Sequence, residues 1–186
     1  MRILGIDPGT VITGIGLIEC NDKQIELVHY GSINMKPSEA LPNRLKKIYD
    51  SCLECIEQFR PDEFAIETAF YSKNVQSTLK LGQARGVAII AAVNHNLVIS
   101  EYSPREVKKS VTGNGSSSKE TVKEIIKKIL QFKEDPEFID SSDALAVALC
   151  HYFNANSMVI SNGKSKKTSW KKFIEENPEK IISRRA

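Results

Sequence analysis

The order of strand-like and helix-like patterns along the chain restricts the fold more than any other feature. Residues 2–33 contain three strand patterns in succession, separated by short polar turns, which predicts an antiparallel meander. Helical and strand patterns then alternate, and a strand–helix–strand crossover makes its two strands parallel. We predict strands at residues 2–7, 13–18, 25–33, 64–67 and 97–102, and helices at residues 41–59, 74–94, 103–111, 119–132 and 140–153.

This order predicts an α/β protein of the ribonuclease H-like fold class. Such a protein has a mixed five-stranded sheet, made of three antiparallel strands and then parallel βα units, flanked by helices. In that topology the first strand is central and pairs with the fourth. The first strand is rich in Ile and Leu with little alternation, as expected for a strand that is buried on both faces.

The composition is that of one globular domain followed by a basic tail. The chain has 186 residues, of which 41% are hydrophobic, and this is enough for a substantial core. We place the folded domain at residues 1–155 and a flexible basic tail at 156–186, because residues 164–186 hold eight Lys or Arg against three Glu. No apolar run approaches the ~18 residues of a membrane span, so we expect a cytoplasmic protein without membrane contacts.

Acidic residues occur where three of the predicted elements begin or end. Asp7 ends the first apolar run, and Glu67 ends the fourth strand. Asp140 and Asp143 lie at the start of the last helix, three residues apart, so both project from one helical face. Because the first and fourth strands are neighbours in the predicted sheet, we expect these four carboxylates to converge on one site.

Four converging carboxylates repel one another unless cations neutralise them. We therefore predict that the four acids are both catalytic residues and ligands of two Mg²⁺ ions, with the choice between Mg²⁺ and Mn²⁺ left open. Two such ions would activate a water and stabilise the leaving oxygen of a phosphodiester. The strand and turn around Asp7 also resemble the phosphate-binding start of actin-like ATPases and sugar kinases, but those proteins need a second copy of the fold.

The predicted helix at residues 74–94 carries glycines at two positions four residues apart, Gly82 and Gly86. Glycine inside a helix costs helix propensity, so we expect close packing against another backbone to offset that cost. Two partners are possible for this helix, namely the sheet of the same chain or the same helix of a second copy in a symmetric dimer.

Four motifs together resemble the RuvC family of Holliday-junction resolvases. The motifs are GIDPGT at residues 5–10, AIE at 65–67, LKLGQARGV at 79–87 and DSSDALA at 140–146. The resemblance extends from residue 2 to about residue 152. It implies a Mg²⁺-dependent homodimer that makes paired symmetric nicks in a four-way DNA junction, leaving 5′-phosphate and 3′-hydroxyl ends, in homologous recombination and DNA repair. It also implies the RuvA and RuvB branch-migration proteins as partners.

The same resemblance assigns roles to further residues. Asp7, Glu67, Asp140 and Asp143 match the catalytic acids of the family. Phe70 matches an aromatic residue that stacks on unpaired bases, and Lys108 and Lys119 match basic residues near the scissile phosphate, so all three are candidate DNA-binding residues.

Two other functions use the same sequence features. A ribonuclease H acting on RNA–DNA hybrids would use the same acids, and a non-catalytic junction-binding protein would use the same DNA contacts. The glycine-containing helix and Phe70 favour the dimeric junction nuclease over the first alternative. The intact acids argue against the second, since carboxylates near DNA without a metal would weaken binding.

Overall fold

The computed structural model describes residues 1–21, 24–68, 74–131 and 136–163, and for residues 136–140 and 156–163 it describes the backbone alone. The chain divides into two units, Met1–Asn154 and Ala155–Ala186. The predicted basic tail at residues 164–186 lies outside the described residues. No helix in the described part of the chain combines the length and apolar character that a bilayer span requires.

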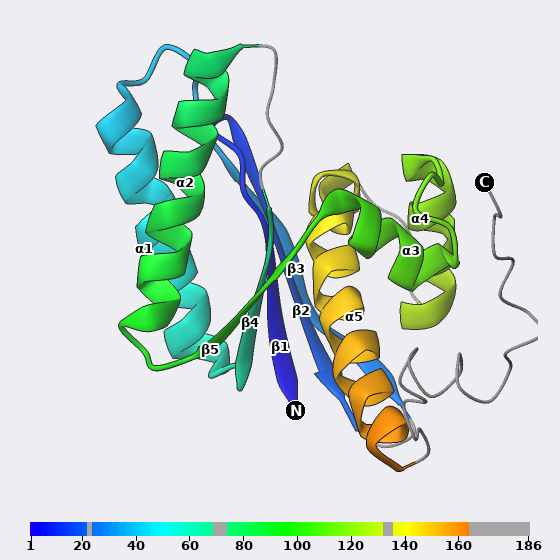
Figure 1. Ribbon diagram of the computed structural model, residues 1–186. Helices are drawn as coiled ribbons and strands as arrows, with labels where there is room; N and C mark the ends of the chain where they lie inside the picture. The colour runs from blue at the N-terminus through cyan, green and yellow to red at the C-terminus, as the bar shows by residue number, and fades with distance from the viewer. Residues whose placement is uncertain (22–23, 69–73, 132–135, 164–186) are drawn as a thin grey trace, which may run out of the picture. The chain divides into compact units, whose positions relative to one another are not determined.

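A five-stranded sheet in the order β3-β2-β1-β4-β5 forms the centre of the first unit (Figure 1). β1 pairs antiparallel with β2 and parallel with β4, and β4 pairs parallel with β5. The predicted mixed sheet, with the first strand between the second and the fourth, is therefore confirmed. The strands are β1 Arg2–Asp7, β2 Ile12–Cys20, β3 Ile25–Asn34, β4 Glu63–Glu67 and β5 Val98–Tyr102.

Helices cover the sheet on both faces. α1 and α2 pack on one face, and α5 packs on the other, beyond which lie α3 and α4 (Figure 1). Each face has its own apolar core, and the alternation along β1 divides the strand between them: Leu4 and Ile6 join the α1 and α2 core, whereas Ile3 joins the α5 core. The helices are α1 Leu41–Phe59, α2 Val75–Val93, α3 Pro104–Thr112, α4 Lys119–Leu130 and α5 Pro136–Gly163.

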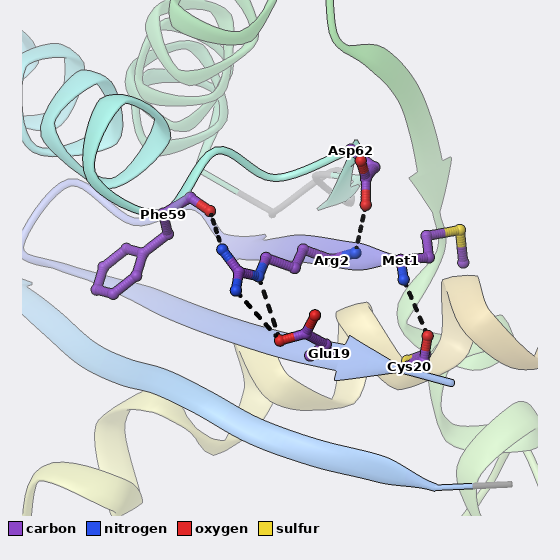
Figure 2. A network of polar contacts seen from close by, with 6 residues as sticks. All are labelled: Met1, Arg2, Glu19, Cys20, Phe59 and Asp62. Carbon is purple, nitrogen blue, oxygen red and sulfur yellow. Dashed lines mark hydrogen bonds and ion pairs between the residues drawn. The ribbon is translucent and has the colours of Figure 1, made fainter. Parts of the chain in front are cut away.

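The N-terminal end of β1 is held by polar contacts far from its last residue, Asp7. Arg2 contacts Glu19 of β2 at 3.3 Å and donates to the carbonyl of Phe59 at 2.9 Å, and its backbone N–H donates to Asp62 at 2.6 Å (Figure 2). These contacts fix β1 against β2 and the end of α1 without involving α5.

Three predicted helix ends are wrong, one in α4 and two in α5. α4 ends at Leu130, because Gln131 takes a left-handed conformation with φ of 51° that cannot continue a helix. α5 begins at Pro136 instead of Asp140 and runs to Gly163 instead of Phe153. Pro136 is well suited to a first helical turn, and no Pro or Gly interrupts the sequence before Gly163.

Of the two partners considered for Gly82 and Gly86, the sheet of the same chain does not pack closely against either glycine. A Cβ atom added at either glycine would have no neighbour within 4 Å among the described residues. The buried face of α2 is instead lined by alanines: Ala84, Ala88, Ala91 and Ala92.

Candidate active site

The parallel pairing of β1 with β4 brings the first two predicted acids together. The register pairs Ile6 with Ile66, so Asp7 and Glu67 follow as the last residues of two adjacent strands. Their carboxyl groups are hydrogen-bonded to each other. In both strands the acid lies on the face of the sheet that α5 covers, because the side chains alternate and Ile3 and Ala65 belong to that core.

α5 carries the third acid, and two glycines in the sheet allow it to come close. A Cβ atom at Gly5 of β1 would lie 2.3 Å from the carbonyl oxygen of Ala144, and one at Gly16 of β2 would lie 2.7 Å from the nitrogen of Leu145. No real Cβ atom tolerates such distances, so only glycine permits α5 to rest directly on β1 and β2. This contact places Asp143 at the end of β1 beside Asp7.

Asp140 is the fifth residue of α5, just past its first turn and three residues before Asp143. Its side chain lies outside the described residues.

The turn after Asp7 is fixed by two side chains that sequence analysis did not single out. Thr13 is fully buried, and its hydroxyl donates to the carbonyl of Gly9 at 2.7 Å and accepts from the N–H of Gly9 at 3.1 Å. Arg44, a buried residue of α1, donates from its guanidinium to the carbonyl of Thr10 at 2.7 Å. These bonds leave the turn little freedom, which keeps the adjacent carboxylate of Asp7 in place.

The acids open into one cavity of about 290 Å³ between β1, β4, α3, α4 and α5. Its polar lining consists of three acids and two lysines, and its apolar lining comes from the helices. The lining residues are Asp7, Glu67, Pro104, Val107, Lys108, Lys119, Val122, Asp143 and Ala146. Three of the four predicted acids and two of the three predicted DNA-binding residues are thus brought to one place. Phe70 lies outside the described residues.

Burial and mutual repulsion make two of the acids weak. The pKa of Glu67 is raised to about 9, first by burial and then by the charge of Asp7. Burial also raises the pKa of Asp7, although the hydrogen bond from Glu67 acts in the opposite direction. At neutral pH Glu67 therefore keeps its proton and donates it to the carboxylate of Asp7.

Lys119 neutralises the third acid. Its ammonium lies 2.5 Å from the carboxylate of Asp143, and this bond is the main reason why the pKa of Lys119 is raised. Lys119 is the first residue of α4, directly after Ser118, whose hydroxyl accepts from the N–H of Thr121 and caps the helix. The helix start thus holds a cation at the rim of the acidic cavity.

The residues present fit a divalent metal ion. All donors are carboxylate oxygens, the ligands that Mg²⁺ prefers, and the raised pKa values show that the acids lack enough positive charge to ionise together. Within the described part of the chain, no three His, Cys, Asp or Glu side chains already stand at the spacing of a metal site. The Asp7, Glu67 and Asp143 carboxylates would therefore exchange the shared proton and the Lys119 ammonium for a metal.

The fold and the acidic cavity define a ribonuclease H-like nuclease. Residues 3–151 match the family described as Crossover junction endodeoxyribonuclease RuvC. The chain belongs to this RuvC family.

Relatives and solved structures agree with the assignment. A crossover junction endodeoxyribonuclease of Chloroherpeton thalassium is 45% identical over 98% of this chain and 100% of its own length. One from Cytophaga hutchinsonii is 45% identical over 96% of this chain and 87% of its own length. The structure of T. thermophilus RuvC in complex with Holliday junction substrate is similar at a TM-score of 0.79 and 32% identity, covering 84% of this chain and 96% of that one.

A more distant structure shares the fold alone. The yeast mitochondrial Holliday junction resolvase has a TM-score of 0.58 at 16% identity, covering 84% of this chain and 83% of that one.

Proposed function

We propose that this chain is a Holliday-junction resolvase, an endonuclease that nicks a four-way DNA junction and leaves 5′-phosphate and 3′-hydroxyl ends. The observation that carries the proposal is the convergence of Asp7, Glu67 and Asp143 from three separate elements in one cavity that Lys108 and Lys119 also line. Acids supply metal ligands and lysines attract the phosphate, which is the combination that phosphodiester hydrolysis requires.

In this proposal Asp7, Glu67 and Asp143, together with Asp140, hold two Mg²⁺ ions, with Mn²⁺ as a substitute. Bound there, the ions would lower the pKa of a water and stabilise the leaving 3′ oxygen. Asp7 is central to this set because it interacts with both Glu67 and Asp143. Lys108 and Lys119 draw the scissile phosphate to the cavity, and Phe70 stacks on an unpaired base.

We propose that the enzyme acts as a homodimer through α2, since paired nicks need two active sites. The outward face of α2 carries an apolar stripe with helical spacing. Val75, Leu79, Ile90 and Val93 are 69%, 64%, 49% and 47% exposed. Gly82 and Gly86 lie in the middle of this stripe, and no described residue lies within 4 Å of the position that a Cβ would take at either glycine. A second α2 related by a two-fold axis would cover the stripe and let the backbones approach at the glycines.

The remaining features of the proposal concern the cell. We infer that the protein works in the cytoplasm with the RuvA and RuvB branch-migration proteins, which would present a four-way junction to the dimer. Residues 1–155 then form the nuclease domain, and the basic segment at 156–186 adds salt-dependent contacts to DNA phosphates.

The test is cleavage of a synthetic mobile four-way junction, alongside linear duplex and an RNA–DNA hybrid, with Mg²⁺ or with EDTA. We expect symmetric paired nicks in the junction alone and only with Mg²⁺. Asp7→Asn should abolish cleavage and keep junction binding, whereas Asp50→Asn, which removes an acid that pairs with Lys46 on α1, should leave cleavage unchanged. Cleavage by Asp7→Asn at the wild-type rate would refute the proposed site.

The dimer is tested by sedimentation of two variants that place a charge on equally exposed apolar residues. Leu79 and Val98 are both 64% exposed, the first in the α2 stripe and the second at the start of β5. We expect Leu79→Asp to raise the dimer dissociation constant at least a hundredfold, because a charge in an apolar interface is costly to bury. Val98→Asp should sediment as wild type, and equal behaviour of the two variants would remove α2 as the interface.

A further inference from the structure

A chain of three hydrogen-bonded side chains joins α5 to the two strands beside the cavity, at a distance from the acids. His151 of α5 is buried, with 5% of its surface exposed. Its Nδ1 lies 2.7 Å from the hydroxyl of Tyr102 on β5, and its Nε2 contacts the carboxylate of Glu63 on β4. None of these residues lines the acidic cavity.

The chemistry of the three groups fixes the direction of the bond to Glu63, and for a neutral ring it also fixes the direction of the bond to Tyr102. A carboxylate can only accept, so the Nε2 of His151 carries a hydrogen and donates it to Glu63. In the neutral ring Nδ1 is then an acceptor, and the hydroxyl of Tyr102 donates to it. Every polar atom of the imidazole is therefore used, and the ring has one orientation that satisfies both neighbours.

The spacing along the helix matches the spacing along the strand. Glu63 and Glu67 lie on the same face of β4, four residues apart, or ~13 Å at 3.3 Å per residue. Asp143 and His151 are eight residues apart on α5, or ~12 Å at 1.5 Å per residue. α5 thus meets β4 at two places of equal separation, the metal-site acids at one end and the His151–Glu63 bond at the other.

We infer that His151 is a positioning residue. It fixes the position of α5 along the direction of β4, so that Asp143 stays beside Glu67 and Asp7. Gly5 and Gly16 seat α5 on β1 and β2, whereas His151 ties the helix to β4 and β5. Apolar contacts resist sliding weakly because they are not directional. A slide of one residue would move Asp143 by ~1.5 Å, and misplacements of about 1 Å can cost ~100-fold in rate.

The inference rests on the proposed metal site and is tested on the full-length protein by calorimetric titration with Mg²⁺ alone. His151→Leu fills most of the same volume but makes neither hydrogen bond, and we expect the Mg²⁺ dissociation constant to rise about tenfold, the lower end of the effect of removing a group that orients metal ligands. His151→Gln keeps a donor for Glu63 and should recover most of the affinity. Tyr102→Phe removes one of the two bonds and should raise the constant less, by about threefold, which is half of the tenfold effect on a free-energy scale.

Arg2→Met is the matched control. Arg2 holds β1 to Glu19 and to the carbonyl of Phe59, near the same end of the sheet as Glu63, and the hydrogen bonds drawn in Figure 2 go to β2 and to the end of α1 rather than to α5. It should lower the unfolding midpoint without changing Mg²⁺ affinity. Single-turnover cleavage at saturating Mg²⁺ should show a smaller loss for His151→Leu than cleavage at low Mg²⁺, and junction binding in EDTA should be unchanged.

One set of results would refute the positioning role of His151, and a different result would refute the metal site on which the inference rests. If His151→Leu is destabilised like Arg2→Met but binds Mg²⁺ as wild type does, the His151 bonds stabilise the fold without positioning Asp143. If His151→Leu does not fold, wild-type Mg²⁺ affinity in Tyr102→Phe leads to the same conclusion. Equal Mg²⁺ affinity of wild type and Asp7→Asn would instead refute the proposed metal site itself.

Discussion

Replacing Glu67 by Gln should stabilise the protein while it destroys the nuclease. Glu67 is half-buried beside Asp7, and desolvation together with the charge of Asp7 raises its pKa to about 9 from an ordinary value of 4.5. A glutamine amide can donate to Asp7 as the protonated carboxyl does, but it has no proton to lose. The substitution therefore removes a titration and keeps the hydrogen bond.

The size of the effect follows from the two pKa values. Because the native state binds this proton more tightly than the unfolded chain, the stability it contributes is complete below pH 4.5 and is lost as the pH rises toward 9. At pH 7 the pH lies 7 − 4.5 = 2.5 units above the pKa of this carboxyl in the unfolded chain, but still below its pKa of about 9 in the native state. At 1.36 kcal/mol per unit this amounts to about 3 kcal/mol.

The assay is urea denaturation of wild type and Glu67→Gln in EDTA at several pH values between 5 and 8. The free energy of unfolding of the variant should exceed that of wild type by a gap that widens by about 1.4 kcal/mol per pH unit. Mg²⁺ should stabilise wild type increasingly as the pH rises, since its ligands must lose their protons, and should have a much smaller effect on the variant.

The control is Glu57→Gln, which removes an exposed carboxylate from α1. It should follow the wild-type pH dependence. If the curves of Glu67→Gln and wild type run parallel, Glu67 has the same pKa in the native and unfolded states, and the argument from burial beside Asp7 is refuted.

Two further predictions concern the seating of α5 and the charge at the rim of the cavity. Gly5→Ala should destabilise the protein by about 1–3 kcal/mol and abolish cleavage, because its Cβ would lie 2.3 Å from the carbonyl oxygen of Ala144. Gly82→Ala, with open space in front of it, should not destabilise the monomer in the same urea titration, and an equal loss in both would contradict the argument. Lys119→Met should slow cleavage and reduce the salt slope of junction binding by about one, measured by fluorescence anisotropy. The same variant should bind Mg²⁺ more tightly, because the Lys119 ammonium no longer competes for Asp143; an unchanged slope and affinity would show that Lys119 has neither role.

The strands and most helices could be predicted because their signals are local. The apolar run that ends at Asp7 and the one that ends at Glu67 mark strands whatever surrounds them. The rule that a strand–helix–strand crossover gives parallel strands then places these two acids side by side. The C-terminal end of α5 was mispredicted because the polar residues after Phe153 look like a loop in sequence, although nothing in them prevents a helix.

Contacts between distant segments gave no local signal. Arg44 looks like a solvent-exposed residue of an amphipathic helix, yet it is buried because its partner is the carbonyl of Thr10. His151 appears isolated in the sequence, and its partners Tyr102 and Glu63 are 49 and 88 residues away. A pattern read within one helix cannot show either contact.

The sequence by itself determined the elements, their order and the positions of the acids, since hydrophobic periodicity and turn residues act over a few neighbours. Only the tertiary structure decided what those residues do together. The pKa of Glu67 depends on burial and on the charge of Asp7, the seat of Asp143 depends on two glycines in β1 and β2, and the open stripe on α2 depends on which face the sheet covers. Each of these depends on which segments are neighbours in the folded protein. Desolvation, charge repulsion and close packing act between residues that are close in space, even when they are far apart in sequence.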